Sequence, residues 1–252
     1  MSFPVVIRLS VKDTLETSTT NKWGCRLGTK GEDEFGRTFR LAKAGIAIPG
    51  YQRLLINGNF CPAATGHEGV NGYEGNLHAA AAAGDTVVQT AETTARAANY
   101  YEGGWMSYFS ATVQSSIPIV SSKKGTGVYV ELTLGAPLPV ALTVAMGVDS
   151  YCNPYSNIRK GMDISSGFES FMGVALCAVA SGSYFWLQTA GPCQLESSGT
   201  YIGATTICRE AFAHIDGCVQ EAAATEGRQN VGYVISATVN AYGDLFCMLK
   251  CE

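Results

Sequence analysis

Apolar and polar positions alternate in many short runs along this chain, and the pattern predicts β-strands rather than helices. The clearest run is 128–134, where every second residue is a valine or leucine and the residues between them are Tyr, Glu and Thr. A period of two is typical of a strand that is buried on one side. Two further pairs of strands, with turn signals at 181–183 and 242–244, predict β-hairpins.

The segment 33–45, DEFGRTFRLAKAG, shows the same alternation beside a cluster of charges. It predicts a turn around Phe35 and Gly36, followed by a strand over 37–43. Side chains alternate along a strand, so its odd-numbered residues face one way and its even-numbered residues the other. No nucleophile, metal ligand or phosphate-binding loop accompanies the segment.

Composition supports a mainly β fold, since 29 of the 252 residues are Gly and only 15% are charged. We expect β-barrel or β-sandwich domains built from short antiparallel strands, with an extended N-terminal arm. The expected boundaries are an arm with short strands over 1–60, a β domain over 61–150, a linker over 151–170 and a C-terminal β domain over 171–252.

Two segments are less regular. The alanine run 79–83 has helical propensity, but it is short and ends at a Gly-Asp pair, so we interpret it as strand. The segment 209–227 is interpreted as either a short helix or a loop.

The charge pattern narrows the function classes. The net charge is −4 and no basic stripe is present, so no direct nucleic-acid binding is expected. No apolar run of about 18 residues and no signal-peptide pattern occur, which predicts a soluble protein with no membrane partner, made in a cytoplasm.

Candidate catalytic chemistry is sparse. His67, His78 and His214 match no zinc-binding spacing, and the sequence predicts no cofactor. Most of the nine cysteines are interpreted as small buried apolar residues, although disulfides formed in an oxidising medium stay open. His214 lies two residues before Asp216, which leaves a cysteine- or histidine-dependent hydrolase as an alternative. Because no catalytic constellation is recognised, we predict a structural or binding protein rather than an enzyme.

Aromatic residues gather at 100–109 and again at 184–186. At strand spacing such residues usually pack in a core or across strands. Exposed aromatic side chains would instead suit sugar or protein binding.

Five phrases follow one another along the chain: EFGRTFRLAKAG, ARAANYYEGGW, LTLGAPLPVAL, NPYSNI and GSYFWLQTAGPC. Their order resembles a family of tailed-bacteriophage virion proteins associated with capsid decoration. The last phrase carries the closest match, at Gly182, Tyr184, Trp186, Gln188, Thr189, Gly191, Pro192 and Cys193. Leu41, where the family usually has an aromatic residue, and Phe185, where it usually has glycine, depart from the pattern.

The resemblance implies a capsid decoration, or cement, protein on the outer surface of an icosahedral phage head. Such a protein bridges neighbouring subunits of the major capsid protein, is often a homo-oligomer with a trimer favoured, and needs no cofactor. It would be made in the host cytoplasm and located in the virion, on the capsid surface.

Within that role, we expect the strand after the Phe35 turn to dock on the partner through an exposed edge and through Arg37, Phe39, Arg40 and Lys43. An ordinary internal hairpin is the alternative for this segment. For the whole protein, the alternative is a head-fibre or tail-associated virion protein that binds host glycans, in which case the aromatic residues of 100–109 would be exposed.

Overall fold

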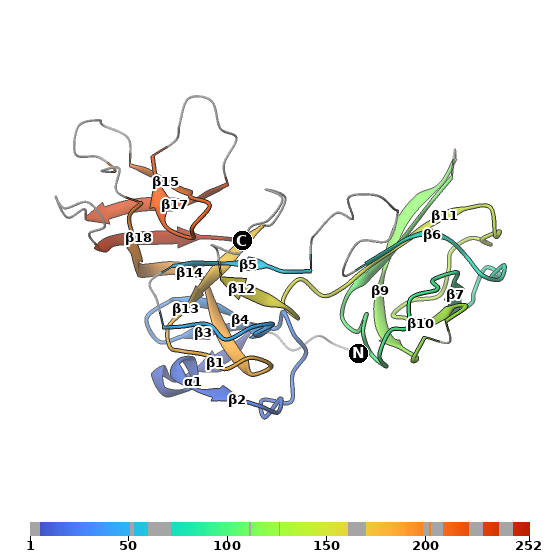
Figure 1. Ribbon diagram of the computed structural model, residues 1–252, viewed down its shortest axis with the longest axis horizontal. Coiled ribbons are helices and arrows are strands. Elements are labelled where there is room, and N and C mark those ends of the chain that lie inside the picture. Colours follow the sequence, from blue (N-terminus) through green and yellow to red (C-terminus); the bar gives the residue numbers. More distant parts are fainter. Residues whose placement is uncertain are drawn as a thin grey trace. The chain divides into compact units, whose positions relative to one another are not determined.

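The structure is a computed structural model, and it describes residues 6–50, 53–59, 72–110, 112–125, 127–160, 170–198, 202, 209–221, 229–236 and 244–252. Strands dominate it, which confirms the predicted mainly β class (Figure 1). The chain forms two compact units. The split unit consists of Met1–Gly58 and Tyr155–Glu252, and the inserted unit is Asn59–Pro154.

The split unit contains a twelve-stranded sheet and one short helix, α1 (Val11–Leu15). A capping box begins α1, in which Ser10 and Asp13 each bond the other's backbone N–H. The strands are β1 (Ile7–Leu9), β2 (Thr17–Ser18), β3 (Lys30–Asp33), β4 (Thr38–Lys43), β5 (Leu54–Asn57), β12 (Ile158–Lys160), β13 (Phe171–Ala175), β14 (Tyr184–Glu196), β15 (Glu210–Ala213), β16 (Val219–Gln220), β17 (Asn230–Ser236) and β18 (Asp244–Lys250).

The thirteen-residue strand β14 organises this unit, because it pairs with β2, β4, β13 and β18 (Figure 1). Apolar clusters lie on both sides of the β4–β14 pair. One cluster contains Phe39, Leu41 and Trp186, and the other contains Ala42 and Phe185. Neighbouring residues of one strand point to opposite faces, so both faces of this pair are covered by core.

This arrangement corrects the expected domain organisation. The segment predicted as an extended arm, 1–60, supplies β1 to β5, and its strand β4 pairs with β14 over Thr38–Lys43. The segments 1–60 and 171–252 therefore share one sheet instead of forming an arm and a separate C-terminal domain. The prediction failed because alternation shows that a segment is a strand but not which distant strand it pairs with.

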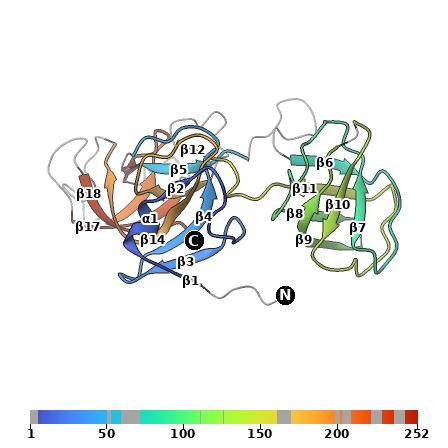
Figure 2. The same ribbon diagram turned by 90° about the horizontal axis from the view of Figure 1, so that it is seen from below.

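The inserted unit has a six-stranded sheet in the order β6-β11-β8-β9-β10-β7 (Figure 2). Its strands are β6 (Gly72–Asn76), β7 (Val87–Thr90), β8 (Trp105–Phe109), β9 (Gln114–Ser122), β10 (Val130–Leu134) and β11 (Gly147–Tyr151). The two end strands meet, because Leu77 and Thr90 form an isolated bridge and His78 N–H donates to the Gln89 carbonyl at 2.8 Å. The sheet therefore curls around its core, and this unit closely matches the predicted β domain 61–150.

Inside the inserted unit a buried ion pair accompanies the apolar core. Glu92 is fully buried, and Arg96 contacts it with 2.5 Å between Nε and Oε1. The Tyr101 hydroxyl donates to the other carboxylate oxygen of Glu92 at 2.7 Å. These contacts compensate the carboxylate for lost hydration, as buried charges require.

The structure also shows which secondary structure the two less regular segments adopt. Residues 210–213 and 219–220 form β15 and β16, so the interpretation as helix or loop is wrong for these strands, whereas 214–218 form the turn between them; residues 222–228 lie outside the described residues. In the alanine run only Ala81 pairs, through an isolated bridge to Leu142, so the strand predicted over 79–83 is not formed.

Candidate binding surfaces

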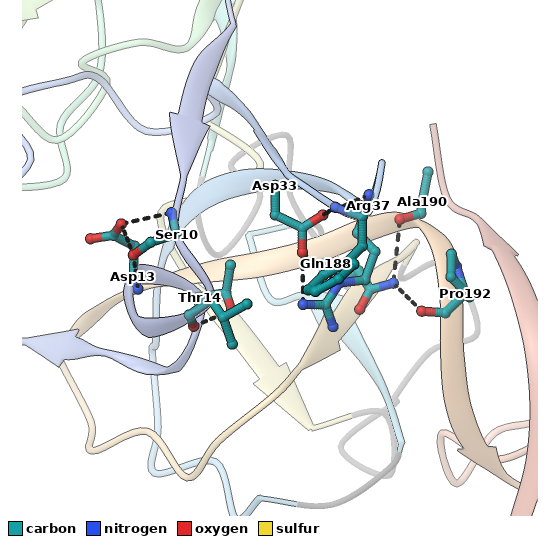
Figure 3. A network of polar contacts seen from close by, with 10 residues as sticks. Ser10, Asp13, Thr14, Asp33, Arg37, Gln188, Ala190 and Pro192 are labelled. Atoms are coloured by element: carbon teal, nitrogen blue, oxygen red, sulfur yellow. Dashed lines mark hydrogen bonds and ion pairs between the residues drawn. The ribbon is translucent and has the colours of Figure 1, made fainter.

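A rigid turn joins β3 to β4 and carries an exposed phenylalanine at its tip. The Asp33 carboxylate is buried and accepts hydrogen bonds from the backbone N–H groups of Phe35 at 3.0 Å and Arg37 at 2.9 Å. The Arg37 guanidinium bonds the same carboxylate, at 2.7 Å from Nε (Figure 3). Gly36 has a φ of +74°, which glycine adopts without strain. Phe35, held on this turn, is 64% exposed.

The predicted partner-binding residues of β4 are largely engaged within their own unit. β4 lies between β3 and β14, so the expectation of an exposed strand edge is wrong. Phe39 is 0% exposed and packs in the core, which removes it from any contact surface. Arg40 bonds Glu252 at 2.9 Å, and the Lys43 ammonium lies 5.3 Å from the centre of the Tyr184 ring.

Arg37, Arg40 and Lys43 keep part of their surface exposed, and their contact with a partner stays a prediction. Sequence reasoning missed Phe35 as a contact residue and treated it only as part of the turn. Its place between Glu34 and Gly36, at a turn without a second large apolar residue, was the available signal.

The phrase GSYFWLQTAGPC lies on β14 and is structural. Trp186, Gln188 and Thr189 are fully buried. The Gln188 amide donates to the carbonyl of Pro192 at 3.0 Å, beside an irregularity in the pairing with β4 (Figure 3). Gly191 has a φ of +97°, and a Cβ there would lie 3.0 Å from the Cα of Arg37. These residues therefore fix how β14 supports the turn and β4.

For the hydrolase alternative, the described residues offer a contact between His214 and Asp216, and the thiol beside it is not activated. His214 Nδ1 lies 2.7 Å from Oδ1 of Asp216, and the same oxygen accepts the backbone N–H of Cys218. Burial, reinforced by the nearby Asp216 carboxylate, raises the pKa of the Cys218 thiol to about 12. A thiol with that pKa is protonated near neutral pH, so this cysteine is a poor nucleophile.

Among the described residues, no two cysteines are joined by a disulfide. Four of these cysteines are buried, namely Cys152, Cys193, Cys218 and Cys247. Cys61 and Cys208 lie outside the described residues. Within the same described part of the chain, no group of three or more His, Cys, Asp or Glu side chains is placed to hold a metal ion.

The short helix α1 is the longest that we observe, and nowhere in the described segments is a helix long and apolar enough to cross a bilayer.

The C-terminal hairpin of the split unit exposes a second apolar surface, which we call the C-terminal apolar patch. It consists of Tyr233 and Ile235 on β17 and Phe246 on β18, all about half exposed. Tyr233 and Ile235 lie on the same side of β17 by strand alternation, and Phe246 lies opposite the exposed Ser236. Exposed apolar groups of this kind mark interaction surfaces when they are contiguous.

The inserted unit presents an open face across four neighbouring strands, β6, β11, β8 and β9. Strand register places its residues in three rows, which are Gly72–Tyr151–Trp105–Pro118, Glu74–Asp149–Ser107–Ser116 and Asn76–Gly147–Phe109–Gln114. Trp105 is 48% exposed, Tyr151 45% and Phe109 43%, while Met106 and Tyr108 point into the core. Part of the aromatic group at 100–109 is therefore exposed and part is core.

Two carboxylates stand side by side in the middle row. Asp149 and Glu74 are direct cross-strand partners, and the Tyr151 hydroxyl donates to Oδ2 of Asp149 at 3.0 Å. Burial raises the pKa of Asp149; the hydroxyl bond from Tyr151 opposes this rise, and the negative charge of Glu74 adds to it. Oδ1 of Asp149 is buried and has no hydrogen-bond partner among the described residues.

No family profile matches this chain, and comparison with the curated proteins and with the solved structures finds no significant match.

Proposed function

We propose that this protein is a virion structural protein that decorates the capsid of a tailed bacteriophage. It binds the outer surface of the icosahedral head and bridges neighbouring subunits of the major capsid protein. The sequence phrases that resemble the decoration family support the proposal. The observation that carries it is the rigid turn that holds Phe35 64% exposed beside the buried Asp33 carboxylate and its ion-pair partner Arg37.

A rigid aromatic tip suits attachment to a large protein surface. Ordering a flexible loop at an interface costs free energy, and a turn already fixed by four contacts to Asp33 avoids most of that cost. Aromatic anchors carry much of the binding free energy in protein interfaces. Arg37, stacked 5.8 Å from the centre of the Phe35 ring, adds a positive charge at the rim of the contact.

Many copies on one particle strengthen each single attachment. Linked binding events raise retention far above the affinity of one contact, provided that the geometry lets them engage together. We assign self-association, with a trimer favoured, to the C-terminal apolar patch of Tyr233, Ile235 and Phe246. An assembled oligomer would bring several Phe35 turns to neighbouring capsid subunits.

The test measures retention of the purified protein on expanded capsids. Phe35→Ala should bind about 30-fold more weakly, because truncating an aromatic anchor costs about 2 kcal/mol. Val144→Ala removes an exposed apolar side chain from the inserted unit and serves as the matched control. Wild-type protein should be found on particles in a simple ratio to the major capsid protein. Absence from assembled heads, or full retention of Phe35→Ala, would argue against the proposal.

The second candidate is a head-fibre or tail-associated virion protein that binds host glycans. The exposure of Trp105 and Phe109 favours it, because this candidate required exposed aromatic residues at 100–109. The two candidates use different units of the chain and are compatible in one molecule. Capsid retention tests the first, and sugar binding by the inserted unit tests the second.

A further inference from the structure

The open face of the inserted unit combines stacking surfaces with hydrogen-bonding groups in alternating rows. Two aromatic rows, one with Trp105 and Tyr151 and one with Phe109, flank a row of carboxylates and hydroxyls. We infer that this face binds a neutral oligosaccharide, with sugar rings stacked on the aromatic side chains and sugar hydroxyls bonded to the middle row. This inference rests on the second candidate function, for which it names the class of sugar, and it does not depend on capsid attachment.

The aromatic rings lie over the sheet as platforms. A Cβ on Gly147 would lie 2.5 Å from the ring of Phe109, so that ring rests on the glycine with one side covered and the other toward solvent. The hydroxyl of Tyr151 reaches Asp149, two residues earlier on β11, so the Tyr151 ring also leans along its strand. A pyranose ring has an apolar C–H face, which packs well on such flat aromatic surfaces.

Two glycines set the position of Trp105. Gly103 has a φ of +73°, and a Cβ on Gly104 would lie only 1.9 Å from the carbonyl oxygen of Tyr151. Only glycine permits β8 and β11 to approach so closely at this point. The close approach places Trp105 directly opposite Tyr151 and fixes the first aromatic row before any ligand binds.

The middle row offers acceptors and donors for hydroxyl groups. The hydroxyls of Ser107 and Ser116 bond each other at 2.7 Å, and each can also bond a ligand. Carboxylates form short, strong hydrogen bonds with hydroxyl donors. Oδ1 of Asp149 lacks a donor among the described residues, while Oδ2 accepts from the hydroxyl of the half-exposed Tyr151. A sugar hydroxyl would supply the missing donor.

Charge selects the class of glycan. None of the residues in the three rows is Lys, Arg or His, whereas Glu74 and Asp149 bring two carboxylates to their centre. Sulfated, phosphorylated or sialylated sugars would therefore be repelled. Trp105 and Phe109 are four residues apart on β8, about 13 Å at the rise of a strand. That span suits a chain of several sugars better than a single one.

The same charges disfavour a protein or a second copy of this chain on the face. Charged residues are depleted at the centre of protein interfaces, and here two carboxylates lie between the aromatic rows. In a two-fold contact centred on this face the middle row meets its own equivalent, so Glu74 and Asp149 would meet like charges.

The experiment titrates the full-length protein with neutral glucan and chitin oligosaccharides and, in parallel, with sulfated and sialylated ones. Binding is followed by NMR and by tryptophan fluorescence, in which Trp105 is the only tryptophan of the inserted unit, since Trp23 and Trp186 belong to the split unit. We expect at least one neutral oligosaccharide to bind and to change this signal. Trp105→Ala, Tyr151→Ala and Phe109→Ala should each weaken binding about tenfold; NMR measures this loss for Trp105→Ala.

Val87→Ala, an exposed apolar residue on β7 outside the three rows, is the matched control and should bind like wild type. Thermal unfolding of every variant checks that the inserted unit is folded. Binding of no neutral sugar at millimolar concentration, a preference for acidic sugars, or wild-type binding by all three aromatic variants would overturn the inference. So would an oligomer of this chain that Trp105→Ala dissociates.

Failure here is separable from failure of the proposed function. Trp105→Ala should stay on capsids, and Phe35→Ala should still bind sugar, because the two residues belong to different units.

Discussion

Strands β4 and β8 show how two similar sequence patterns lead to opposite surfaces. Both are short strands with conspicuous side chains, basic residues in β4 and aromatic residues in β8, and both lie between two other strands of their sheets. In β4, Phe39 is buried and Arg40 and Lys43 contact their own unit. In β8, Trp105 and Phe109 are held at the surface.

The difference comes from how many faces of each strand are covered. Apolar clusters cover both faces of the β4–β14 pair, so successive apolar side chains there pack into one cluster or the other. Only one face of β8 meets the core of the inserted unit, so successive side chains there point alternately to the core and to solvent. In this chain, binding surfaces are therefore sought on sheet faces and turns and not on strand edges.

The largest expected effect is at Phe39. Phe39→Ala should destabilise the split unit by about 3–5 kcal/mol, because it removes a fully buried aromatic side chain. Phe109→Ala, the matched change in the inserted unit, should cost about 1 kcal/mol because Phe109 is half exposed. Scanning calorimetry measures both. Equal losses for the two variants would contradict the contrast between β4 and β8.

A smaller effect is expected at the turn before β4. Arg37→Ala leaves the buried Asp33 carboxylate without its cation and should lower the free energy of unfolding by about 3 kcal/mol. This loss is at the low end for broken buried ion pairs because Arg37 is partly exposed. Lys43→Ala loses only a cation–π contact and should cost about 0.5–1 kcal/mol. Urea unfolding of the two variants compares these losses. If Lys43→Ala proved as costly as Arg37→Ala, the basic residues of this region would not differ in the way their contacts indicate.

The smallest effect is a pH dependence on the open face. Folding raises the pKa of Asp149 above its ordinary value, so the stability linked to this group is present at low pH and falls as pH rises through the raised pKa. Asp149→Asn should therefore raise the melting temperature of the inserted unit at pH 7. The gain should shrink toward zero as the solution is acidified below the unfolded pKa.

Melting curves of wild type and Asp149→Asn across this pH range check the sign. Glu102→Gln, at an exposed carboxylate of the same unit, is the control and should show no comparable trend. If the gain in melting temperature grew on acidification, the pKa of Asp149 would be lowered by folding and not raised.

Local features of the fold were predictable from the sequence. Alternation predicted β10 with its buried valine and leucines, and turn signals predicted the pairing of β13 with β14 and of β17 with β18. The turn at 181–183 is formed, with Gly182 at a φ of +78°, whereas 242 and 243 lie outside the described residues. These features depend on neighbours in sequence, which a local pattern can encode.

Long-range features were not predictable in the same way. The pairing of β4 with β14 joins residues about 140 positions apart, as Lys43 opposite Tyr184 illustrates. The exposure of Trp105 also depends on register, because Tyr108 on the same strand is equally aromatic yet fully buried. Phe35 needed the Asp33 network to become a rigid tip, and no alternation pattern contains that information.

The path of the chain between the two units carries a consequence for engineering. The chain leaves the sheet after β5 and re-enters just before β12, where the Gly58 N–H donates to the Asn157 carbonyl at 2.8 Å. The two chain segments that lead to and from the inserted unit are therefore hydrogen-bonded to each other within the split unit. Another domain whose termini lie close together could replace residues 59–154 at this insertion point without altering the strand pairing of the twelve-stranded sheet.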